Sequence, residues 1–568
     1  MKTILVAINA KFIHSNLAVR YLKKYAEQHG QEGIDFKEYT INQSLDYILS
    51  EIYEENPDVI GFSSYIWNIN YVKKLCIELR KLMPQIKIFL GGPEVSFDHE
   101  ILREIGADYL IYGEGEKSFS ALIDAITNKS SISKVNGISY LKDGEVVTNP
   151  PATALELDEL PFPYDDVAEF KDRIIYYETM RGCPYNCGYC LSSVEKGVRF
   201  KTLDKVYTEL QFFLENNIRQ VKFVDRTFNC NKLHCIAIVE YLKKHDNQET
   251  NFHFEIAAEN VSDEFISAVK DARHGLFQFE IGVQSTNAET LTAIDRKSEF
   301  AHLKDVVAKL QKSKNIHLHL DLIAGLPFEG IDTFEKSFND VHSMKPDQLQ
   351  LGFLKLLKGS MLHREKEQFG IVSREYPPYE VLFTSNITAT EMIKLKKIED
   401  MVETFYNSNR FKLTVDFLAK GERSPFEFYS KLAEFYYSKG LHHRPHSKTD
   451  YYNILHDFYQ TKNPSPTESE SLKWLMKFDI YSHEKAKKLP DFYENQNDYH
   501  EVKKFLKQNE DIVKYLSQYI NLPINSLMKR VHVEFFPFNP ITGEDGSVTI
   551  VWNYNKTDIL GNTEYIIL

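Results

Sequence analysis

The chain has 568 residues, 43% of them hydrophobic and 13% aromatic, which is more than one hydrophobic core can hold and predicts about three or four domains. Its six cysteines, three of them within eight residues, exclude a secreted disulfide framework, and the lack of a long apolar run predicts no membrane span, so we expect a cytoplasmic protein. A net charge of −13 gives no general attraction to phosphate backbones; nucleic acid is therefore not an expected partner, although a local basic groove is compatible with this charge.

Apolar runs and stretches of helical period alternate through the first 130 residues. Alternation of this kind predicts a doubly wound parallel sheet, whose ligands bind outside the carboxyl ends of the strands. Small residues follow several of these strands and let a flat, bulky ligand approach the backbone. An ordinary flavodoxin-like domain whose glycines only make turns is the alternative. The predicted strands are 3–8, 35–39, 59–63, 86–90 and 109–112, and the predicted helices include 17–29, 71–81 and 118–126.

Residues 131–170 interrupt this alternation. Two turn dipeptides, Asn136-Gly137 and Asp143-Gly144, lie around short alternating runs and predict a small hairpin. The prolines of 149–163 then indicate an extended connection to the next domain.

Three cysteines, Cys183, Cys187 and Cys190, follow a predicted strand at 174–179. The residues between them favour turns and positive φ, so the segment is a loop that can point three sulfurs at one place. Four thiolates would suit a closed zinc site, whereas three leave one iron of a [4Fe-4S] cluster open to another ligand. The spacing therefore predicts such a cluster.

The β/α alternation resumes between about 171 and 360, with strands at 174–179, 220–224, 252–257, 277–283, 316–324 and 348–354. Six parallel strands predict a partial barrel with its site at the carboxyl ends of the strands. Charged side chains inside barrel strands are costly unless they pair or bind something, although each alone is more often a structural ion pair. The polar side chains near these ends include Asp225, Glu255, Glu280, Gln284, Ser285 and Asp321.

Beyond residue 360 the chain becomes mainly helical. We expect helices at 391–406, 425–439, 468–478 and 499–520, then a small antiparallel sheet from strands at 531–536, 547–552 and 565–568. This region is expected to cap the barrel mouth and to help define the substrate. The run His442–His446 is expected to be a solvated loop, with a metal or phosphate site as the alternative. Cys76 is expected in a core, and no function is assigned to Cys230 and Cys235.

The order of these loops, followed by the three-cysteine motif, resembles the cobalamin (B12)-binding radical S-adenosylmethionine (SAM) family, and the helical region resembles the DUF4080-like extension of one subgroup. The resemblance implies a Rossmann-like cobalamin-binding domain at 1–130, a hairpin and linker at 131–170, a partial (β/α)6 barrel at 171–360 and a mainly helical capping domain at 361–568. The residues that it implies around cobalamin are Ser63, Ser64, Gly91, Gly92, Pro93, Glu94, Gly113, Glu114, Gly115 and Glu116.

One departure from other cobalamin proteins concerns the cobalt ligand. His14 lies in the first loop but lacks the Asp-x-His-x-x-Gly context that supplies an axial histidine. We therefore expect His14 near the cofactor without ligating it, and the lower face of the cobalt opposite Tyr65 or Trp67.

The resemblance also implies roles around SAM. The three cysteines would ligate the cluster, and Tyr189 would pack at the adenine. Asp225 lies in the segment that receives the methionine amino group, with Glu255 beside that group. Gln284, followed by Ser285, would lie near the ribose, Arg296 at the SAM carboxylate and Asp321 at the ribose hydroxyls.

The implied reaction is methylation of an unactivated carbon. Reduced cobalamin takes a methyl group from one SAM, and a substrate radical made by the 5′-deoxyadenosyl radical of a second SAM takes it from methylcobalamin. The expected partners are a small-molecule or peptide substrate and an electron donor such as flavodoxin or ferredoxin. Two alternatives stay open: a cobalamin radical SAM enzyme that cyclises, rearranges or oxidises its substrate without methylating it, and a cobalamin- or redox-sensing regulator that catalyses nothing.

Overall fold

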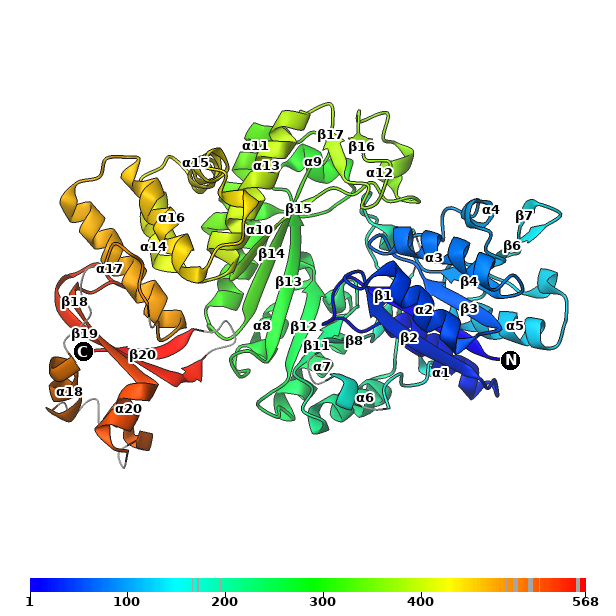
Figure 1. Cartoon of the computed structure of the whole chain (residues 1–568), viewed down its shortest axis with the longest axis horizontal. Helices are drawn as coiled ribbons and strands as arrows, with labels where there is room; N and C mark the ends of the chain where they lie inside the picture. The colour runs from blue at the N-terminus through cyan, green and yellow to red at the C-terminus, as the bar shows by residue number, and fades with distance from the viewer. Residues whose placement is uncertain are drawn as a thin grey trace. The chain divides into compact units, whose positions relative to one another are not determined.

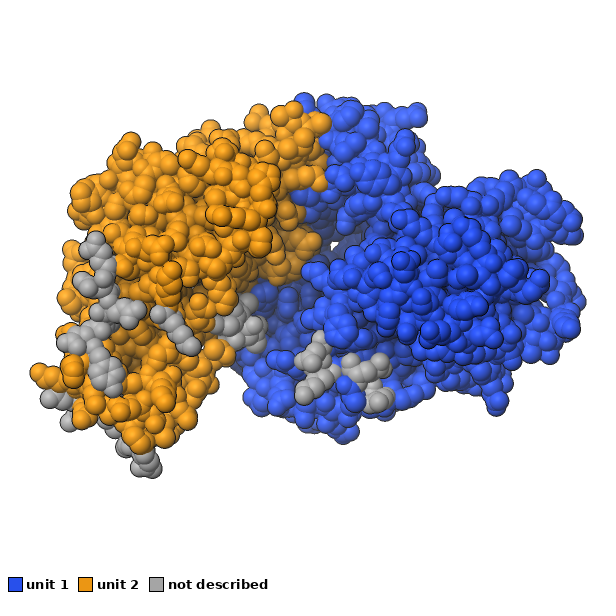
Figure 2. All heavy atoms as spheres, in the orientation of Figure 1, with its two compact units in different colours: residues 1–318, 323–330, 352–388 blue, residues 319–322, 331–351, 389–568 orange. Residues whose placement is uncertain are grey.

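The computed structural model describes residues 1–165, 167–170, 173–194, 197–486, 488–493, 499–508, 514–519, 522–557 and 562–568. They form two compact units (Figure 2). The first unit contains 1–318, 323–330 and 352–388, and the second contains 319–322, 331–351 and 389–568. Within the described ranges, no helix has both the length and the apolar character needed to cross a membrane.

The first unit begins with a seven-stranded sheet in the order β2-β1-β3-β4-β5-β6-β7 (Figure 1). Strands β1 to β5 are parallel, as predicted, and the order places a topological switch between β1 and β3, where such sheets bind ligands. The strands are β1 (Thr3–Asn9), β2 (Ile34–Thr40), β3 (Val59–Ser63), β4 (Lys87–Gly91), β5 (Tyr109–Ile111), β6 (Ile138–Lys142) and β7 (Glu145–Thr148). The helices between them are α1 (Leu17–Gln28), α2 (Leu45–Glu55), α3 (Ile69–Leu82), α4 (Ile101–Ile105) and α5 (Glu116–Thr127).

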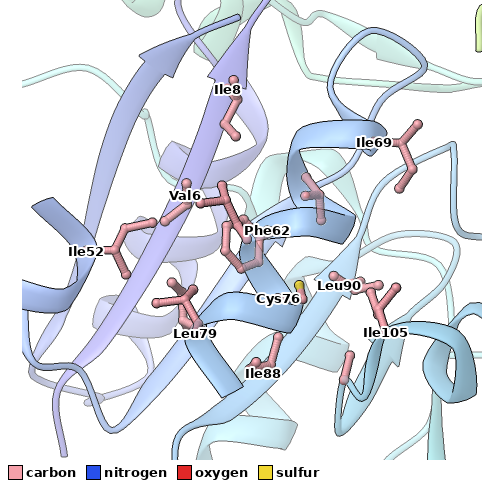
Figure 3. Close-up of a cluster of buried hydrophobic side chains, with 14 of the residues drawn as sticks. Val6, Ile8, Ile52, Phe62, Ile69, Cys76, Leu79, Ile88, Leu90 and Ile105 are labelled. Atoms are coloured by element: carbon pink, nitrogen blue, oxygen red, sulfur yellow. The ribbon is translucent and has the colours of Figure 1, made fainter. Parts of the chain in front are cut away.

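Helices cover both faces of this sheet because its strands are apolar on both sides. Along β1, Val6 and Ile8 point into a core formed with α2 and α3, whereas Leu5 and Ala7 point into a second core formed with α1 and α5. Figure 3 shows the first of these cores, with Cys76 among its aliphatic side chains, where it was predicted.

The hairpin predicted after residue 131 is present and extends the first sheet. Strand β6 pairs antiparallel with β5, and β7 pairs antiparallel with β6. Asp143 and Gly144 both have positive φ, at 53° and 83°, as a two-residue hairpin turn between the paired residues Lys142 and Glu145 requires.

A second sheet of six strands has the order β15-β14-β13-β12-β11-β8. The pairs from β8 to β13 are parallel, and all six strands lie within two or three residues of their predicted positions. They are β8 (Ile175–Tyr177), β11 (Gln220–Phe223), β12 (Asn251–Ile256), β13 (Phe277–Gln284), β14 (His317–Ala324) and β15 (Gln348–Phe353). The helices of this part of the first unit are α6 (Leu203–Glu215), α7 (Lys232–Lys244), α8 (Asp263–Val269), α9 (Ala288–Ala293), α10 (Phe300–Gln311) and α12 (Met361–Arg364), and its short strands are β9 (Met180–Arg181), β10 (Arg199–Phe200), β16 (Val372–Ser373) and β17 (Val381–Phe383).

The second unit is mainly helical and ends in an antiparallel sheet, β18-β19-β20, as predicted. Trp552 is fully buried in its core, and the buried pair Lys477 and Glu534, 2.7 Å apart, joins α17 to β18. Residues 509–513 and 520 of the helix predicted at 499–520 lie outside the described residues. The elements are α11 (Ile331–Ser343), α13 (Ala389–Val402), a π-helical turn (Glu403–Asn407), α14 (Lys412–Ala419), α15 (Pro425–Ser438), α16 (Lys448–Gln460), α17 (Pro466–His483), α18 (Tyr499–Gln508), α20 (Ile524–Arg530), β18 (Val531–Phe538), β19 (Asp545–Thr557) and β20 (Thr563–Ile567).

Candidate functional site

The cysteine loop leaves the carboxyl end of β8 and is closed at its neck by a two-stranded ladder. Strand β9, just before the motif, pairs antiparallel with β10, just after it. Gly182 has a φ of +98°, and a Cβ there would lie 2.1 Å from the carbonyl oxygen of Gly197, so only glycine fits this crossing of the two chains. Within the loop, the N–H of Cys190 donates to the carbonyl of Cys187 at 3.0 Å.

All three thiols of the loop are free, and their surroundings differ. Cys187 is buried, with its Sγ 3.7 Å from Nη1 of Arg296, whereas Cys183 is partly exposed, with its Sγ 3.4 Å from the Thr227 hydroxyl. Burial raises the pKa of the Cys187 thiol, and the neighbouring guanidinium opposes this rise. Three sulfur donors on one loop beside a cation are a donor set that fits a [4Fe-4S] cluster with one iron open.

Asp225, which follows β11, anchors the strand end that carries the cysteine loop. Its carboxylate is fully buried and accepts hydrogen bonds from the N–H groups of Thr179 (2.8 Å) and Met180 (3.1 Å) and from the Thr179 hydroxyl. Burial raises the pKa of Asp225 to about 7. The structure therefore shows this side chain positioning the loop, and its contact with SAM stays a prediction.

Residues at the carboxyl end of β13 come together with Arg296. A Cβ on Gly282 would lie 2.2 Å from Nε2 of Gln284, and the carbonyl of Gly282 accepts a hydrogen bond from Nη2 of Arg296. Ser285 donates at 2.6 Å to Oε1 of Glu329, whose side chain is fully buried. The structure thus brings Gln284, Arg296 and Cys187 together, and their contact with SAM stays a prediction.

The other predicted SAM contacts have different surroundings, and Tyr189 has a side-chain hydrogen bond with Cys187. Tyr189 packs against an apolar cluster that includes Leu291 and Ile294, and burial raises the pKa of its phenol. Glu255, partly exposed, is the register partner of Glu280 on β13. Asp321 lies on β14 in the second unit, where its Oδ1 is 3.0 Å from Nε2 of His319.

The predicted cobalamin cradle lies at the carboxyl ends of β3, β4 and β5. The N–H of Ser64 donates to the carbonyl of Gly91 at 2.7 Å, and Gly92, with φ +110°, packs so closely that a Cβ would lie 2.5 Å from the Ser64 carbonyl oxygen. A Cβ on Gly91, in contrast, would meet nothing closer than 3.8 Å, and one on Gly113 nothing within 4 Å. The open backbone at these two glycines fits a flat ligand.

An aromatic pair stands beside this cradle at the topological switch. Tyr65 and Trp67 stack with centroids 4.4 Å apart and planes at 8°, and the indole N–H of Trp67 donates to the carbonyl of Ile8 at 3.0 Å. His14, also in this region, places Nδ1 2.7 Å from the Tyr176 hydroxyl of β8, and burial is the main cause of its lowered pKa. The tautomer of His14 decides which partner donates in this hydrogen bond, and in either case Nδ1 is engaged with the Tyr176 hydroxyl.

Two predicted cobalamin contacts have arginine partners that sequence reasoning missed. Arg181, two residues before the first cysteine, lies 2.9 Å from Glu116 and 2.9 Å from Glu178, and 3.5 Å from Glu114. Arg199, at the other side of the loop's neck, also pairs with Glu114. The sequence does show that arginines flank the cysteine motif and that glutamates lie in a strand-end loop. It does not indicate which arginine pairs with which glutamate.

The remaining residues of the predicted cradle are Ser63, Pro93, Glu94 and Gly115. Glu94 accepts a hydrogen bond from the Tyr379 hydroxyl, burial being the main cause of its raised pKa. Ser63 and Gly115 are partly exposed at strand and loop ends, and Pro93 is exposed.

Comparison with protein families identifies three regions of the chain. Residues 3–123 match the B12 binding domain, residues 177–341 match the radical SAM superfamily, and residues 367–552 match a protein family of unknown function, DUF4080. These matches confirm the predicted cofactor set of cobalamin, a [4Fe-4S] cluster and SAM.

Several curated proteins are similar over part of the chain. An uncharacterized methyltransferase of Pyrococcus horikoshii is 26% identical over 52% of this chain and 66% of its own length. The cobalamin-dependent radical SAM methyltransferase TokK of Streptomyces tokunonensis is 26% identical over 62% of this chain and 56% of its own length. The chain thus spans about half to two thirds of the curated relatives that it matches.

Two solved structures share the fold. The cobalamin-dependent SAM radical enzyme OxsB with aqua-cobalamin bound superposes with a TM-score of 0.62 at 16% identity, covering 92% of this chain and 84% of that one. The radical SAM methyltransferase TsrM from Kitasatospora setae, with cobalamin and a [4Fe-4S] cluster bound, superposes with a TM-score of 0.57 at 16% identity, covering 67% and 79%. The fold prediction is confirmed by this likeness.

Proposed function

Because the chain belongs to the cobalamin-binding radical SAM proteins, we propose that it is an enzyme that transfers a methyl group to an unactivated carbon of its substrate. The observation that supports this most is the group of ion pairs around Arg181. They join the loop of the predicted cobalamin cradle to the neck of the cysteine loop, two residues from Cys183. A reaction that passes a group between two cofactors needs their sites fixed close to one another.

The side chains of the cysteine loop have defined tasks in this proposal. Cys183, Cys187 and Cys190 hold the cluster, and Asp225 keeps the loop on the end of β8. Arg296, already beside Cys187, receives the carboxylate of SAM, because a guanidinium binds a carboxylate with two parallel hydrogen bonds. When bound, the cluster and SAM supply one-electron radical chemistry, and cobalamin supplies a transferable methyl group.

The other predicted contacts complete the two sites. Tyr189 packs at the adenine of SAM, and Gln284 lies near the ribose. On the cobalamin side, the open backbone at Gly91 and Gly113 receives the flat cofactor. We further propose that the electron comes from a flavodoxin or ferredoxin and that the enzyme works in the cytoplasm.

The test is a reconstitution under strictly anaerobic conditions with cobalamin, iron, sulfide and SAM that carries a deuterated methyl group, to which an extract of the cells that carry the protein is added as the source of the methyl acceptor. The expected result with reductant is release of 5′-deoxyadenosine and transfer of the deuterated methyl group to a product, both read by mass spectrometry. Cys183→Ala is expected to lose iron and both products. Cys76→Ala, a change of a buried core cysteine, is the matched control and keeps both.

The outcomes separate the alternatives. Release of 5′-deoxyadenosine with a product that lacks the label would favour a cyclisation, rearrangement or oxidation. No 5′-deoxyadenosine from fully reconstituted protein would contradict the enzyme proposal and favour a sensor.

A further inference from the structure

One segment of the first unit runs from the barrel sheet to both predicted cofactor sites. We define residues 354–381, which follow β15, as the bracing segment. The N–H of Leu354 donates to the carbonyl of Ala324 at 2.9 Å, and the N–H of Val381 donates to the carbonyl of Leu354 at 2.9 Å. Both ends of the segment are therefore fixed at the carboxyl end of the barrel sheet.

The bracing segment contacts the cysteine loop between its second and third cysteines. The N–H of Leu362, in α12, donates to the carbonyl of Gly188 at 2.9 Å, and a Cβ on Gly188 would lie 2.4 Å from Cε of Met361. Leu362 is fully buried in an apolar cluster against which Tyr189 of the cysteine loop packs. The segment therefore holds the part of the loop that carries two of the predicted cluster ligands.

The bracing segment also contacts the loop that follows β4 in the first sheet. The Tyr379 hydroxyl donates to Oε1 of Glu94. Nζ of Lys358 lies 2.5 Å from Oδ2 of Asp98 and 5.7 Å from the centre of the Tyr379 ring. Glu94 belongs to the predicted cobalamin cradle, so one segment of the chain contacts both this cradle and the cysteine loop.

Tyr379 is held in a backbone conformation that a tyrosine does not favour by itself. Its φ is +54°, in the left-handed region where a residue with a Cβ is strained. The N–H of Leu356 donates to its carbonyl at 2.9 Å, and its own N–H donates to the carbonyl of Tyr376 at 3.0 Å. These bonds fix the direction in which the phenol leaves the chain.

Glu94 keeps one carboxyl oxygen available. Its N–H donates to the carbonyl of Ser64 at 3.3 Å, so its backbone is fixed in the cradle. Its side chain is partly buried, and within the described chain it accepts only from the Tyr379 hydroxyl, with no cation close enough to form an ion pair. Oε2 can therefore accept a hydrogen bond from a bound molecule, since a carboxylate has about four acceptor positions.

Cobalamin carries amide side chains around its corrin ring, and their N–H groups are donors that suit this oxygen. We propose that Tyr379 is a positioning residue for cobalamin, which holds the Glu94 carboxyl group so that Oε2 accepts from one of these amides. Because the bracing segment also contacts the cysteine loop, it fixes the place of the cofactor relative to the cluster.

This role requires that cobalamin binds in the cradle, and it holds whether or not the protein transfers a methyl group. It gives a task to the start of the region that matches DUF4080, residues 367–552, which contains Tyr379.

The test measures the affinity of the full-length protein, with its cluster reconstituted, for hydroxocobalamin. Absorbance titration under anaerobic conditions gives the Kd. Tyr379→Phe is expected to raise this Kd about tenfold, because it removes the hydrogen bond that orients Glu94. Tyr379→Phe combined with Glu94→Ala is expected to raise the Kd no further than Glu94→Ala alone, since residues that act through one another are not additive.

Glu94→Gln separates positioning of the cofactor from support of the loop. Glutamine keeps an oxygen that accepts from Tyr379, but an NH2 group, which donates, replaces the second oxygen. A cofactor held by Oε2 then binds about tenfold more weakly, whereas a contact that only supports the loop would leave the Kd unchanged. This variant also carries the test if Tyr379→Phe does not fold.

Electron paramagnetic resonance reads the place of the cofactor relative to the cluster. The magnetic coupling between Co(II) cobalamin and the reduced cluster depends on the distance between the two centres. At a cobalamin concentration that fills the site, Tyr379→Phe is expected to give a weaker or more broadly distributed coupling than the native protein.

The matched control is Tyr241→Phe. It removes a hydrogen bond of the same kind, in which the Tyr241 hydroxyl of α7 donates to Oε1 of Gln211 of α6 at 2.9 Å. Its Kd for hydroxocobalamin and its magnetic coupling are expected to match those of the native protein.

Each outcome decides for or against this role of Tyr379. A Kd of Tyr379→Phe within about twofold of the native value, or a native Kd in Glu94→Gln, would overturn it. An unchanged magnetic coupling would overturn the link to the cluster. A native protein that binds no hydroxocobalamin would contradict the cradle as well, whereas the expected shifts in a protein that transfers no methyl group would contradict methyl transfer alone and support the positioning role.

Discussion

Replacing Arg181 tests whether its ion pairs fix the cysteine loop to the first domain. The Arg181 side chain is 16% exposed, and its partners Glu116 and Glu178 are 7% and 10% exposed. Arg181→Ala leaves these two carboxylates nearly buried without the cation that pairs them. Glu114 keeps its contact with Arg199 and loses less.

The magnitude follows from this burial. Removing one partner of a buried ion pair costs about 3–5 kcal/mol, because the remaining charge is left uncompensated. Since every member of this group keeps some exposure to water, we expect the lower end, about 3 kcal/mol of local stability. The triple variant Arg181→Met, Glu116→Gln, Glu178→Gln is expected to recover most of this loss, because it leaves no unpaired carboxylate at these positions.

Hydrogen exchange read by mass spectrometry measures this loss where it occurs and needs no global two-state transition. Exchange in peptides covering residues 178–200 is expected to rise by about a hundredfold in Arg181→Ala. The control is Arg103→Ala, because Arg103 pairs with the exposed side chains of Glu100 and Glu145, and such surface pairs contribute about 0–1 kcal/mol. A rise below about tenfold in Arg181→Ala, no larger than in the control, would refute the reasoning.

Three further predictions concern the cofactor sites. Gly91→Ala is expected to leave the stability of the cofactor-free protein unchanged and to weaken cobalamin binding at least about tenfold, as read by absorbance titration. Gly92→Ala is strained by its φ of +110° and is expected to lower stability by about 1–3 kcal/mol, as read by thermal melting. Burial raises the pKa of Asp225 to about 7 from 3.8, so its contribution to stability is full below pH 3.8 and lost as the pH rises through about 7. The melting temperature of Asp225→Asn minus that of the native protein should therefore increase between about pH 5 and pH 8, and a flat difference would contradict the burial argument. His14→Ala is expected to leave the electron paramagnetic resonance spectrum of bound Co(II) cobalamin free of nitrogen coupling, as in the native protein, and a nitrogen coupling lost in the variant would make His14 a ligand.

Local pattern was enough to predict the strands. The strands β1 to β5, β8 and β11 to β15 lie close to their predicted positions, because buried strands appear in the sequence as short apolar runs bounded by turn residues. The chemistry of the cysteine motif was also predicted from Cys183 to Cys190 alone. The three cysteines that are predicted to ligate the cluster lie within one loop, so their spacing in the sequence is enough to predict a cluster.

Contacts between distant segments were not predictable in this way. Glu114 and Glu116 were predicted from their loop as cobalamin contacts, and their pairing with Arg181, 65 residues beyond Glu116, appears only in the folded chain. Asp225 was predicted as a SAM contact, and its buried hydrogen bonds to Thr179 depend on β11 lying beside β8.

The sequence by itself therefore predicted the cluster from the spacing of three cysteines, and it predicted SAM and cobalamin through the resemblance of its loops and motif to a known family. Only the tertiary structure decided which glutamates of the strand-end loop pair with the arginines that flank the cysteine motif. Those features depend on the register between strands and on charges that meet across many residues. The contacts of Lys222 and His253 with Glu280 belong to this second kind, since β11 and β13 become neighbours of β12 only when the sheet forms.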